Sequence, residues 1–176
     1  MKKALLIIAH EDFRDEEYFE TKEVLESHGI KVATASDKKG NALGAYGGET
    51  QASLSLEEID PDKYDAIVFI GGAGASRYLD NEKLYGLINK IGGEKVIGAI
   101  CVAPTILAKS GILKGKACTV WSSNMDKSCI RIVEEHGGKC RDEKIIKDGN
   151  VITANGPAAS QEFGLALAEA LTEKEK

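Results

Sequence analysis

Apolar runs alternate with more polar, helix-like segments along most of the chain. The apolar runs predict strands at residues 4–9, 30–36, 64–70, 96–100 and 117–121. The segments between and after them predict helices at residues 16–28, 81–91, 102–109, 126–136 and 160–171. Such alternation of strand and helix indicates an α/β fold, with a mainly parallel sheet that helices cover on both faces.

Less regular segments complete this pattern. Residues 38–55 are rich in glycine, which predicts a hairpin or an irregular excursion. Residues 144–146 and 151–153 flank the sequence Asp-Gly-Asn, which is typical of a β-hairpin turn. The charged residues 172–176 are expected to fray. No repeat, linker or low-complexity segment interrupts the chain, so we expect one domain over residues 1–176.

Composition and charge narrow the classes of function. The 176 residues are 43% hydrophobic and 29% charged, the balance of an ordinary soluble globular chain. A net charge of −5 without a Lys/Arg cluster argues against nucleic acid and anionic lipid as partners. The N-terminal MKKALLIIAH has too short an apolar run for a signal peptide, and no stretch approaches the length of a membrane span. A cytoplasmic location is therefore expected.

The cysteines do not form a recognisable metal or disulfide pattern. They are Cys101, Cys118, Cys129 and Cys140. No C-x-x-C pair occurs and no histidine stands at zinc-ligand spacing from them, so no metal site is expected. Their number is too low for a disulfide scaffold, which fits a reducing compartment. The last three are evenly spaced, but they fall in a strand, a helix and a strand start, which favours coincidence. A disulfide among these three stays open.

Cys101 stands at a predicted strand-to-helix turn within KVIGAICVAPTILAKSG, residues 95–111. There, unpaired backbone N–H groups and the helix dipole favour the thiolate. The turn also places the sulfur at the carboxyl edge of the sheet, where open α/β folds bind ligands. This geometry is that of a nucleophile elbow, with the Val102 N–H as the first oxyanion donor. A small buried cysteine at a strand end is an equally good interpretation of the local sequence.

The glycine loop Gly71-Gly72-Ala73-Gly74 follows the strand predicted at residues 64–70. It lacks the phase of a G-x-G-x-x-G loop, so it is a weak signal for a dinucleotide, and no cofactor is predicted. In a parallel sheet the loop opens on the same edge as the Cys101 turn. The Gly72 N–H is therefore the second expected oxyanion donor. A tight strand-to-helix turn would require the same glycines, and this structural alternative stays open.

Acidic residues and one histidine follow the first predicted strand. The acidic residues are Glu11, Asp12, Asp15, Glu16 and Glu17. Most of them suit a solvated helix start, where they complement the helix dipole. One carboxyl held against the thiolate would be protonated and would donate a hydrogen bond to sulfur, but spacing does not identify which one. His10 ends the strand and could act as a base for Cys101, whereas a surface histidine beside an acidic loop is the alternative.

Five stretches, in order, resemble the ThiJ/PfpI superfamily, which includes the Parkinson-associated deglycase and archaeal PfpI-type intracellular peptidases. They are KKALLIIA, FRDEEYFE with SHGIKVATAS, YDAIVFIGGAG, GAICVAPTILAKSGILKGK and VITANGPAASQEFGLALAEAL. The resemblance covers nearly the whole chain. It implies a flavodoxin-like three-layer sandwich of the class I glutamine amidotransferase-like type, assembled as a homodimer or a larger homo-oligomer.

The resemblance also implies roles for single residues. The family's nucleophile corresponds to Cys101, and its oxyanion donors correspond to Gly72 and Val102. Its thiol-contacting glutamate, counted back from the glycine that ends the first helix, corresponds to Glu17. The chemistry implied is that of a cysteine nucleophile assisted by a carboxyl group.

The chain departs from the family pattern at several positions, and these departures favour some of the family's activities over others. PfpI-type peptidases carry a histidine directly after the cysteine, where this chain has Val102. Deglycase-like members also lack that histidine, so the site resembles theirs more closely. Glutamine amidotransferases require a downstream His-x-Glu, which this chain lacks. Trp121 stands where relatives have His or Tyr, so it and Ala73 are expected to line a substrate pocket with one apolar wall.

Three functions are compatible with these observations. The first is a cofactor-free cysteine enzyme acting on small reactive carbonyls, in which Glu17, helped by His10, moves the proton for Cys101. The second is a PfpI-like cysteine peptidase or small hydrolase acting on peptides, with a base from another subunit. The third is a redox-sensing or chaperone-like stress protein in which Cys101 is oxidised to sulfenic or sulfinic acid.

Overall fold

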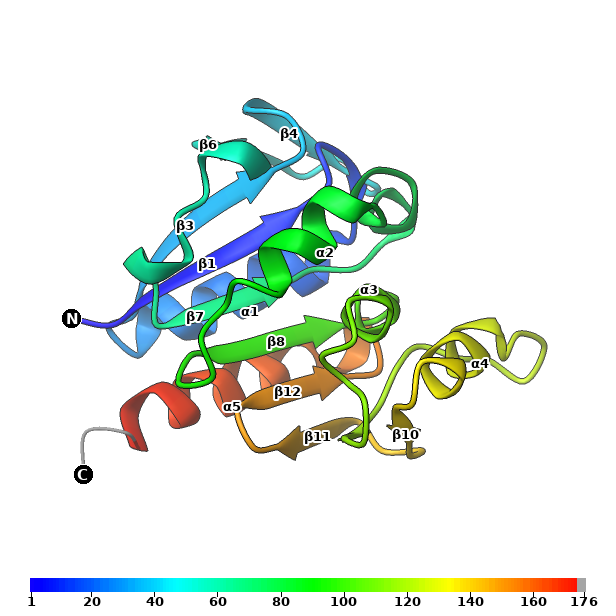
Figure 1. Cartoon of the computed structure of the whole chain (residues 1–176). Helices are drawn as coiled ribbons and strands as arrows, with labels where there is room; N and C mark the ends of the chain where they lie inside the picture. The colour runs from blue at the N-terminus through cyan, green and yellow to red at the C-terminus, as the bar shows by residue number, and fades with distance from the viewer. Residues whose placement is uncertain (174–176) are drawn as a thin grey trace.

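The computed structural model describes residues 1–173, which fold around a seven-stranded sheet (Figure 1). Its strands lie in the order β11-β12-β8-β7-β1-β3-β6. Their bounds are β1 Lys3–Ile8, β3 Lys31–Ser36, β6 Leu54–Ser55, β7 Ala66–Phe69, β8 Val96–Ile100, β11 Ile145–Asp148 and β12 Val151–Ala154. Every neighbouring pair is parallel except β11 with β12. The mainly parallel sheet is confirmed.

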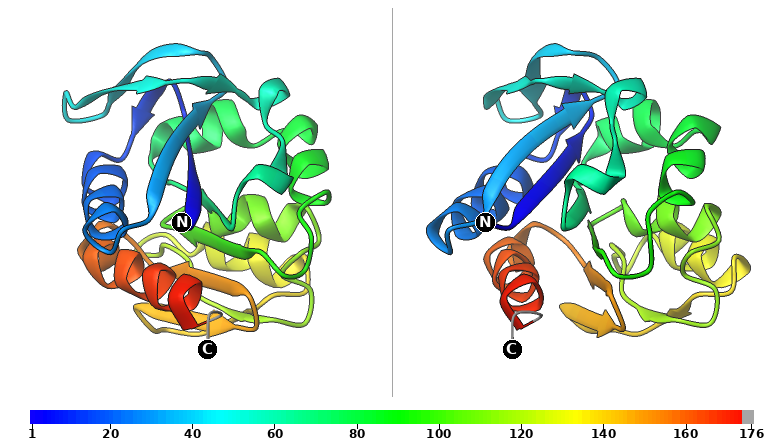
Figure 2. Two further views of the ribbon diagram at one scale, coloured as in Figure 1. Left: turned by 90° about the vertical axis from the view of Figure 1, so that its left-hand side faces the viewer. Right: turned by 60° about the vertical axis from the view of Figure 1, so that its left-hand side comes forward.

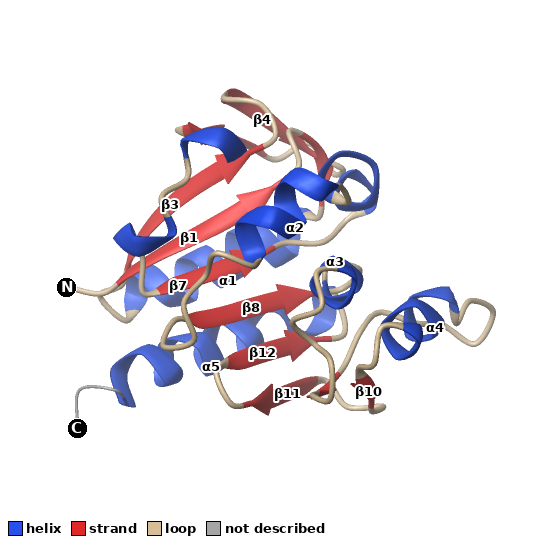
Figure 3. Cartoon of the chain, viewed as in Figure 1, coloured by secondary structure: helices blue, strands red, loops and turns tan. Residues whose placement is uncertain are grey.

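Helices cover both faces of this sheet, as Figures 2 and 3 show. On one face, α1 (Asp15–Ser27) and α5 (Ser160–Glu173) pack against each other. The apolar residues of α2 (Glu82–Ile88), α3 (Pro104–Lys109) and α4 (Ser128–Glu135) join a separate core on the other face. The predicted three-layer sandwich is therefore confirmed.

The alternation of side chains along β1 explains how one strand supports both layers. Leu5 and Ile7 belong to the core beneath α2 and α3, whereas Leu6 and Ile8 belong to the core beneath α1 and α5. All four side chains are fully buried. A central parallel strand covered on both faces needs an apolar residue at every position, and this requirement produces the continuous run in the sequence.

A small three-stranded sheet lies beside the first helix. It consists of β2 (Glu11–Phe13), β4 (Gly40–Gly44) and β5 (Glu49–Ala52). The antiparallel pairing of β4 with β5 confirms the hairpin predicted within residues 38–55. β2 was not predicted, because its acidic residues were assigned to the helix start, and it pairs in parallel with β4.

The strand predicted at residues 117–121 is shorter and lies outside the main sheet. β9 (Ala117–Cys118) pairs in parallel with β10 (Lys139–Cys140) as a separate two-stranded sheet. The strand ends there because the Thr119 N–H donates to the Thr153 hydroxyl and the Trp121 N–H donates to the Cys101 carbonyl. These bonds replace a strand ladder and carry the chain toward Cys101.

The remaining elements are short helical turns. They lie at Leu56–Glu58, Pro61–Lys63, Ala75–Leu79 and Pro157–Ala159. α5 continues through Glu173, so two residues expected to fray are helical, and residues 174–176 of that segment lie outside the described residues. Within residues 1–173, no helix combines the length and apolar character needed to cross a membrane.

Candidate active site

Cys101 lies directly after β8, at the carboxyl edge of the sheet, and just before α3. Figure 1 shows α3 at the carboxyl end of β8. Its φ of 64° places a non-glycine residue in the left-handed region, a strained conformation that the surroundings must hold. Two main-chain hydrogen bonds hold it. The Cys101 N–H donates to the Ala154 carbonyl at 3.0 Å, and the Trp121 N–H donates to the Cys101 carbonyl at 2.8 Å. This is the geometry of the predicted nucleophile elbow.

The amides expected to hold an oxyanion converge on the Cys101 sulfur. The N–H groups of Gly72 and Val102 hydrogen-bond the thiol and act to lower its pKa. Gly72 has a φ of 105°, and a Cβ atom there would lie 2.5 Å from the Arg14 nitrogen. A Cβ atom at Gly71 would lie 2.7 Å from the Cys101 Cβ. The glycines therefore have two roles. They allow the loop to turn tightly, and they allow its backbone to lie close to Cys101.

Glu17 is fully buried in the first turn of α1, beside Cys101. Its Oε2 accepts the Gly71 N–H at 2.9 Å. Its Oε1 has no hydrogen-bond partner of standard geometry within residues 1–173, although the carboxyl and the thiol interact. Burial raises the pKa of Glu17 to about 7, against the opposing effects of the Cys101 thiol and the Gly71 amide. The carboxyl can therefore both accept and release a proton at neutral pH.

The pKa of Cys101 is raised, which is opposite to the expectation of a stabilised thiolate. The residue is only 7% exposed, and burial is the largest cause. The negative charge of Glu17 is the second cause, and the amides of Gly72 and Val102 oppose both. Because ionisation of Glu17 disfavours a second negative charge beside it, the thiol and the carboxyl titrate as a pair.

Trp121 and Ala73, both expected in the pocket, differ in burial and in their contacts. Trp121 is half-buried, packs against the same core as Cys101 and donates the main-chain hydrogen bond described above. Ala73 is exposed in the glycine loop next to Gly72. The main chain of Trp121 therefore contacts Cys101, while Ala73 faces solvent, and their role as pocket residues stays a prediction.

His10 lies just after β1, but its partners are Asp37 directly after β3, Glu11 of β2 and Tyr78 of the Ala75–Leu79 turn. Its Nδ1 is 2.5 Å from Asp37 Oδ2, and its Nε2 is 3.6 Å from Glu11 Oε1. Its ring packs on Tyr78 with 4.4 Å between centroids. No hydrogen bond or ion pair among the described residues joins His10 to Cys101, so the structure does not bring the predicted base to the nucleophile.

Arg14 and Asp15 tie the glycine loop and the β4–β5 turn to the start of α1, and these contacts were not predicted. The Arg14 N–H donates to the Gly71 carbonyl at 3.1 Å, and its guanidinium lies 4.7 Å from the Tyr46 ring centroid. The Asp15 carboxylate accepts the N–H groups of Tyr46 and Gly48, which ties the β4–β5 turn to the start of α1. No local signal pairs these segments, because the contact depends on the small sheet.

The site consists of a thiol, a carboxyl and two amides, a set suited to an electrophilic carbonyl compound. Within the described residues, no group of three or more His, Cys, Asp or Glu side chains is arranged to hold a metal ion.

Comparison with known proteins identifies the family of the chain. Residues 2–170 match the model of the DJ-1/PfpI family. A deglycase of Pyrococcus abyssi is 30% identical over 87% of this chain and 90% of its own length. A glutathione-independent glyoxalase of Caenorhabditis elegans is 30% identical over 99% of this chain and 91% of its own. The crystal structure of a ThiJ/PfpI domain protein from Brachyspira murdochii is similar with a TM-score of 0.90 and 31% identity, covering 97% of this chain and 96% of its own. The chain belongs to the DJ-1/PfpI family.

Proposed function

We propose that this protein is a cofactor-free, cysteine-dependent enzyme that converts small reactive carbonyl compounds, such as methylglyoxal, to hydroxy acids. The observation that carries the proposal is the convergence on Cys101 of two backbone amides and the buried Glu17 carboxyl. The names of two relatives, a deglycase and a glyoxalase, agree with this chemistry. Assembly as a homodimer or larger homo-oligomer is part of the proposal, supported by the exposed apolar side chains of Leu43 and Tyr46.

The first step is addition of the Cys101 thiol to the aldehyde carbon. A bond forms between sulfur and carbon, and the carbonyl electron pair moves to oxygen. The N–H groups of Gly72 and Val102 donate to that oxygen as its charge develops. Glu17 accepts the thiol proton and delivers a proton to the oxygen, which gives a hemithioacetal. A pKa near 7 suits Glu17 for both transfers.

The second step moves a proton between the two oxidised carbons of the bound methylglyoxal. Glu17 removes the hydrogen from the carbon bonded to sulfur, and the resulting enediol is protonated on the neighbouring carbon. The product is a lactoyl thioester on Cys101. Water hydrolyses it, releasing lactate and the free thiol. The net reaction consumes methylglyoxal and water and needs no external electron acceptor.

A peptidase function has less support from the contacts of Cys101. A cysteine peptidase requires a base that activates the thiol and later protonates an amine leaving group. Val102 occupies the position of the peptidase histidine, and His10 is paired with Asp37. Trp121 supplies only an N–H donor. Glu17 alone fits carbonyl addition better than amide cleavage, since addition has no amine leaving group to protonate.

The test is lactate production from methylglyoxal by the purified protein. Cys101→Ser should abolish turnover, and Glu17→Gln should reduce kcat/KM by about 10²–10⁴-fold, the usual contribution of general acid–base catalysis. Cys129→Ser is the matched control, because this partly exposed thiol lies on α4 and packs against the other core. Lactate formation that persists in Cys101→Ser, or is absent from the wild type, would refute the proposal.

A further inference from the structure

Two other cysteines lie side by side, away from the contacts of Cys101. Cys118 of β9 and Cys140 of β10 are direct register partners in the parallel two-stranded sheet. Neighbouring strands lie about 4.8 Å apart, which is within the Cα separation of about 4.4–6.8 Å that a disulfide spans. Register partners project from the same face of a sheet, and a hydrogen bond joins the two thiols. Both cysteines are free in this structure.

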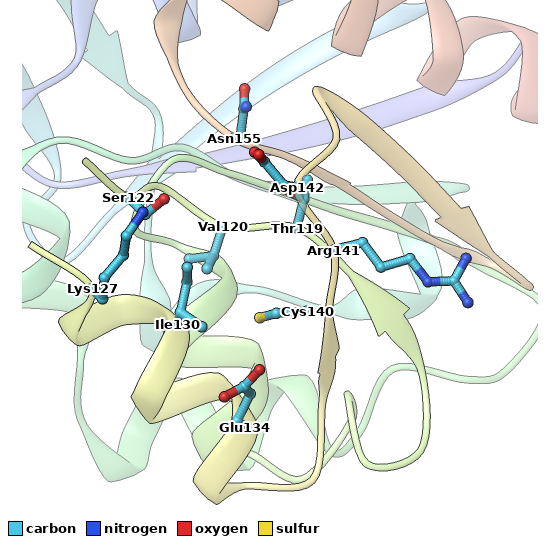
Figure 4. A pocket seen from close by; sticks show the side chains of 10 residues that line it. All are labelled: Thr119, Val120, Ser122, Lys127, Ile130, Glu134, Cys140, Arg141, Asp142 and Asn155. Carbon is cyan, nitrogen blue, oxygen red and sulfur yellow. The ribbon is translucent and has the colours of Figure 1, made fainter. Parts of the chain in front are cut away.

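The two sulfurs differ in their access to solvent. Cys118 is fully buried and belongs to the core that includes Val133 of α4. Cys140 is partly exposed and lines a cavity of about 320 Å³, together with Ile130 and Glu134 of α4. Figure 4 shows the Cys140 sulfur directed between the strand and α4, toward Ile130. A small molecule can therefore reach Cys140 from the cavity, whereas Cys118 is buried and does not line it.

We propose that Cys140 and Cys118 form a second thiol site, a redox-active pair that exchanges with small disulfides entering this cavity. The Cys140 sulfur gives up its proton and attacks one sulfur of a disulfide R–S–S–R. The S–S bond breaks, one R–SH leaves with a proton, and a mixed disulfide remains on Cys140. Cys118 then loses its proton, attacks the Cys140 sulfur and expels the second R–SH. Two protein thiols are oxidised to one disulfide, and R–S–S–R is reduced to two thiols.

Charge around the pair does not favour either sign of reactant. The pKa of Cys118 is lowered by its hydrogen bond with Cys140, whereas the pKa of Cys140 is raised by the same contact and by burial. Transfer of the Cys140 proton to Cys118 along this hydrogen bond therefore places the negative charge on the accessible sulfur. Lys127 and Arg141 line the cavity together with Glu134 and Asp142, so its formal charges balance, and an uncharged small disulfide is the simplest reactant to test.

The test treats the reduced full-length protein with the neutral compound hydroxyethyl disulfide and maps its thiols by mass spectrometry after an acid quench. The wild type should lose two hydrogen atoms and yield a linked pair of peptides containing Cys118 and Cys140. Cys118→Ser should stop at one hydroxyethylthio group on Cys140. Cys140→Ser should take up none on Cys118, because that sulfur is buried. Cys101→Ser and Cys129→Ser should form the same link as the wild type.

Two results would overturn the proposal. In one, Cys118 and Cys140 stay free in the wild type under conditions that modify Cys129. In the other, the linked peptides join Cys140 to Cys129. Circular dichroism establishes whether each serine variant is folded, and the peptide map of the wild type decides the outcome even where a variant is not. The result is independent of the carbonyl chemistry proposed for Cys101.

Discussion

At the scale of single residues, Glu17 determines how the site responds to pH. Burial raises its pKa to about 7 from the ordinary value of 4.5. Between these two values the folded protein keeps a proton that the unfolded chain has lost. The contribution of Glu17 to the free energy of unfolding is therefore fully present below pH 4.5, is lost as the pH rises toward 7, and then stays constant. The raised pKa corresponds to about 3 kcal/mol across this range.

Glu17→Gln should remove this dependence, because an amide does not ionise. The free energy of unfolding of the wild type should fall by about 3 kcal/mol more than that of the variant between pH 4.5 and pH 8. Urea denaturation across this range measures the difference. Glu23→Gln is the control, since Glu23 is exposed on the same helix and should follow the wild type. If the free energy of unfolding depended on pH equally in the wild type and in Glu17→Gln, Glu17 would not titrate in this range.

The sequence is informative about some residues of the site and uninformative about others. Cys101, Gly72 and Val102 could be located because a strand-to-helix turn and a glycine turn have local signals. Glu17 could be chosen from its acidic neighbours only through family resemblance. The raised pKa of Cys101 could not be foreseen, because it depends on burial and on Glu17 of α1. The pairing of His10 with Asp37 could not be foreseen either, because Asp37 lies directly after β3, far along the chain.

At the scale of elements, the position of Glu17 depends on the packing of α1 against α5. Gly164 of α5 lies at this contact, where an added Cβ atom would be 2.9 Å from the Val24 Cβ and 3.3 Å from the Thr21 Cα. The β-branched Val24 has little freedom to move aside. Close helix packing here therefore requires glycine, even though glycine weakens the helix itself.

Gly164→Ala and Gly86→Ala form a matched pair that tests this packing. Both glycines lie within helices, but nothing lies within 4 Å of a Cβ atom at Gly86. Gly86→Ala should raise the free energy of unfolding by up to about 1 kcal/mol through helix propensity. Gly164→Ala should lower the free energy of unfolding by about 1–2 kcal/mol, because the overpacking against Val24 and Thr21 outweighs the gain in helix propensity. Stabilisation by both substitutions would contradict the close packing of α1 on α5.

Elements were predictable where their hydrogen bonds are local or follow the parallel sheet. The strand at residues 96–100 has its predicted bounds, since continuous burial gives it a clear apolar run. β9 ends early because the next N–H groups bond to residues distant in the sequence. The Thr119 N–H donates to Thr153 of β12, and the Trp121 N–H donates to Cys101. Such contacts leave no periodicity in the sequence.

At the scale of the whole molecule, the parallel sheet collects distant residues at one edge. Glu17, Gly72 and Cys101 follow β1, β7 and β8, which are neighbours in the order β8-β7-β1. Alternation of strand and helix predicts that the segments after these strands share an edge, but strand order is not encoded locally. The adjacency of the three strands brings the first turn of α1, the glycine loop and the Cys101 turn together as one site.

The pH dependence of kcat/KM for methylglyoxal, measured for the wild type and Glu17→Gln, tests the Cys101–Glu17 pair most directly. Glu17 must be ionised to accept the thiol proton, so kcat/KM of the wild type should rise to a plateau with a midpoint near pH 7. Glu17→Gln should lack this rise and be about 10²–10⁴-fold slower on the plateau. A wild-type profile in the variant, or no transition near pH 7 in the wild type, would contradict proton transfer by Glu17.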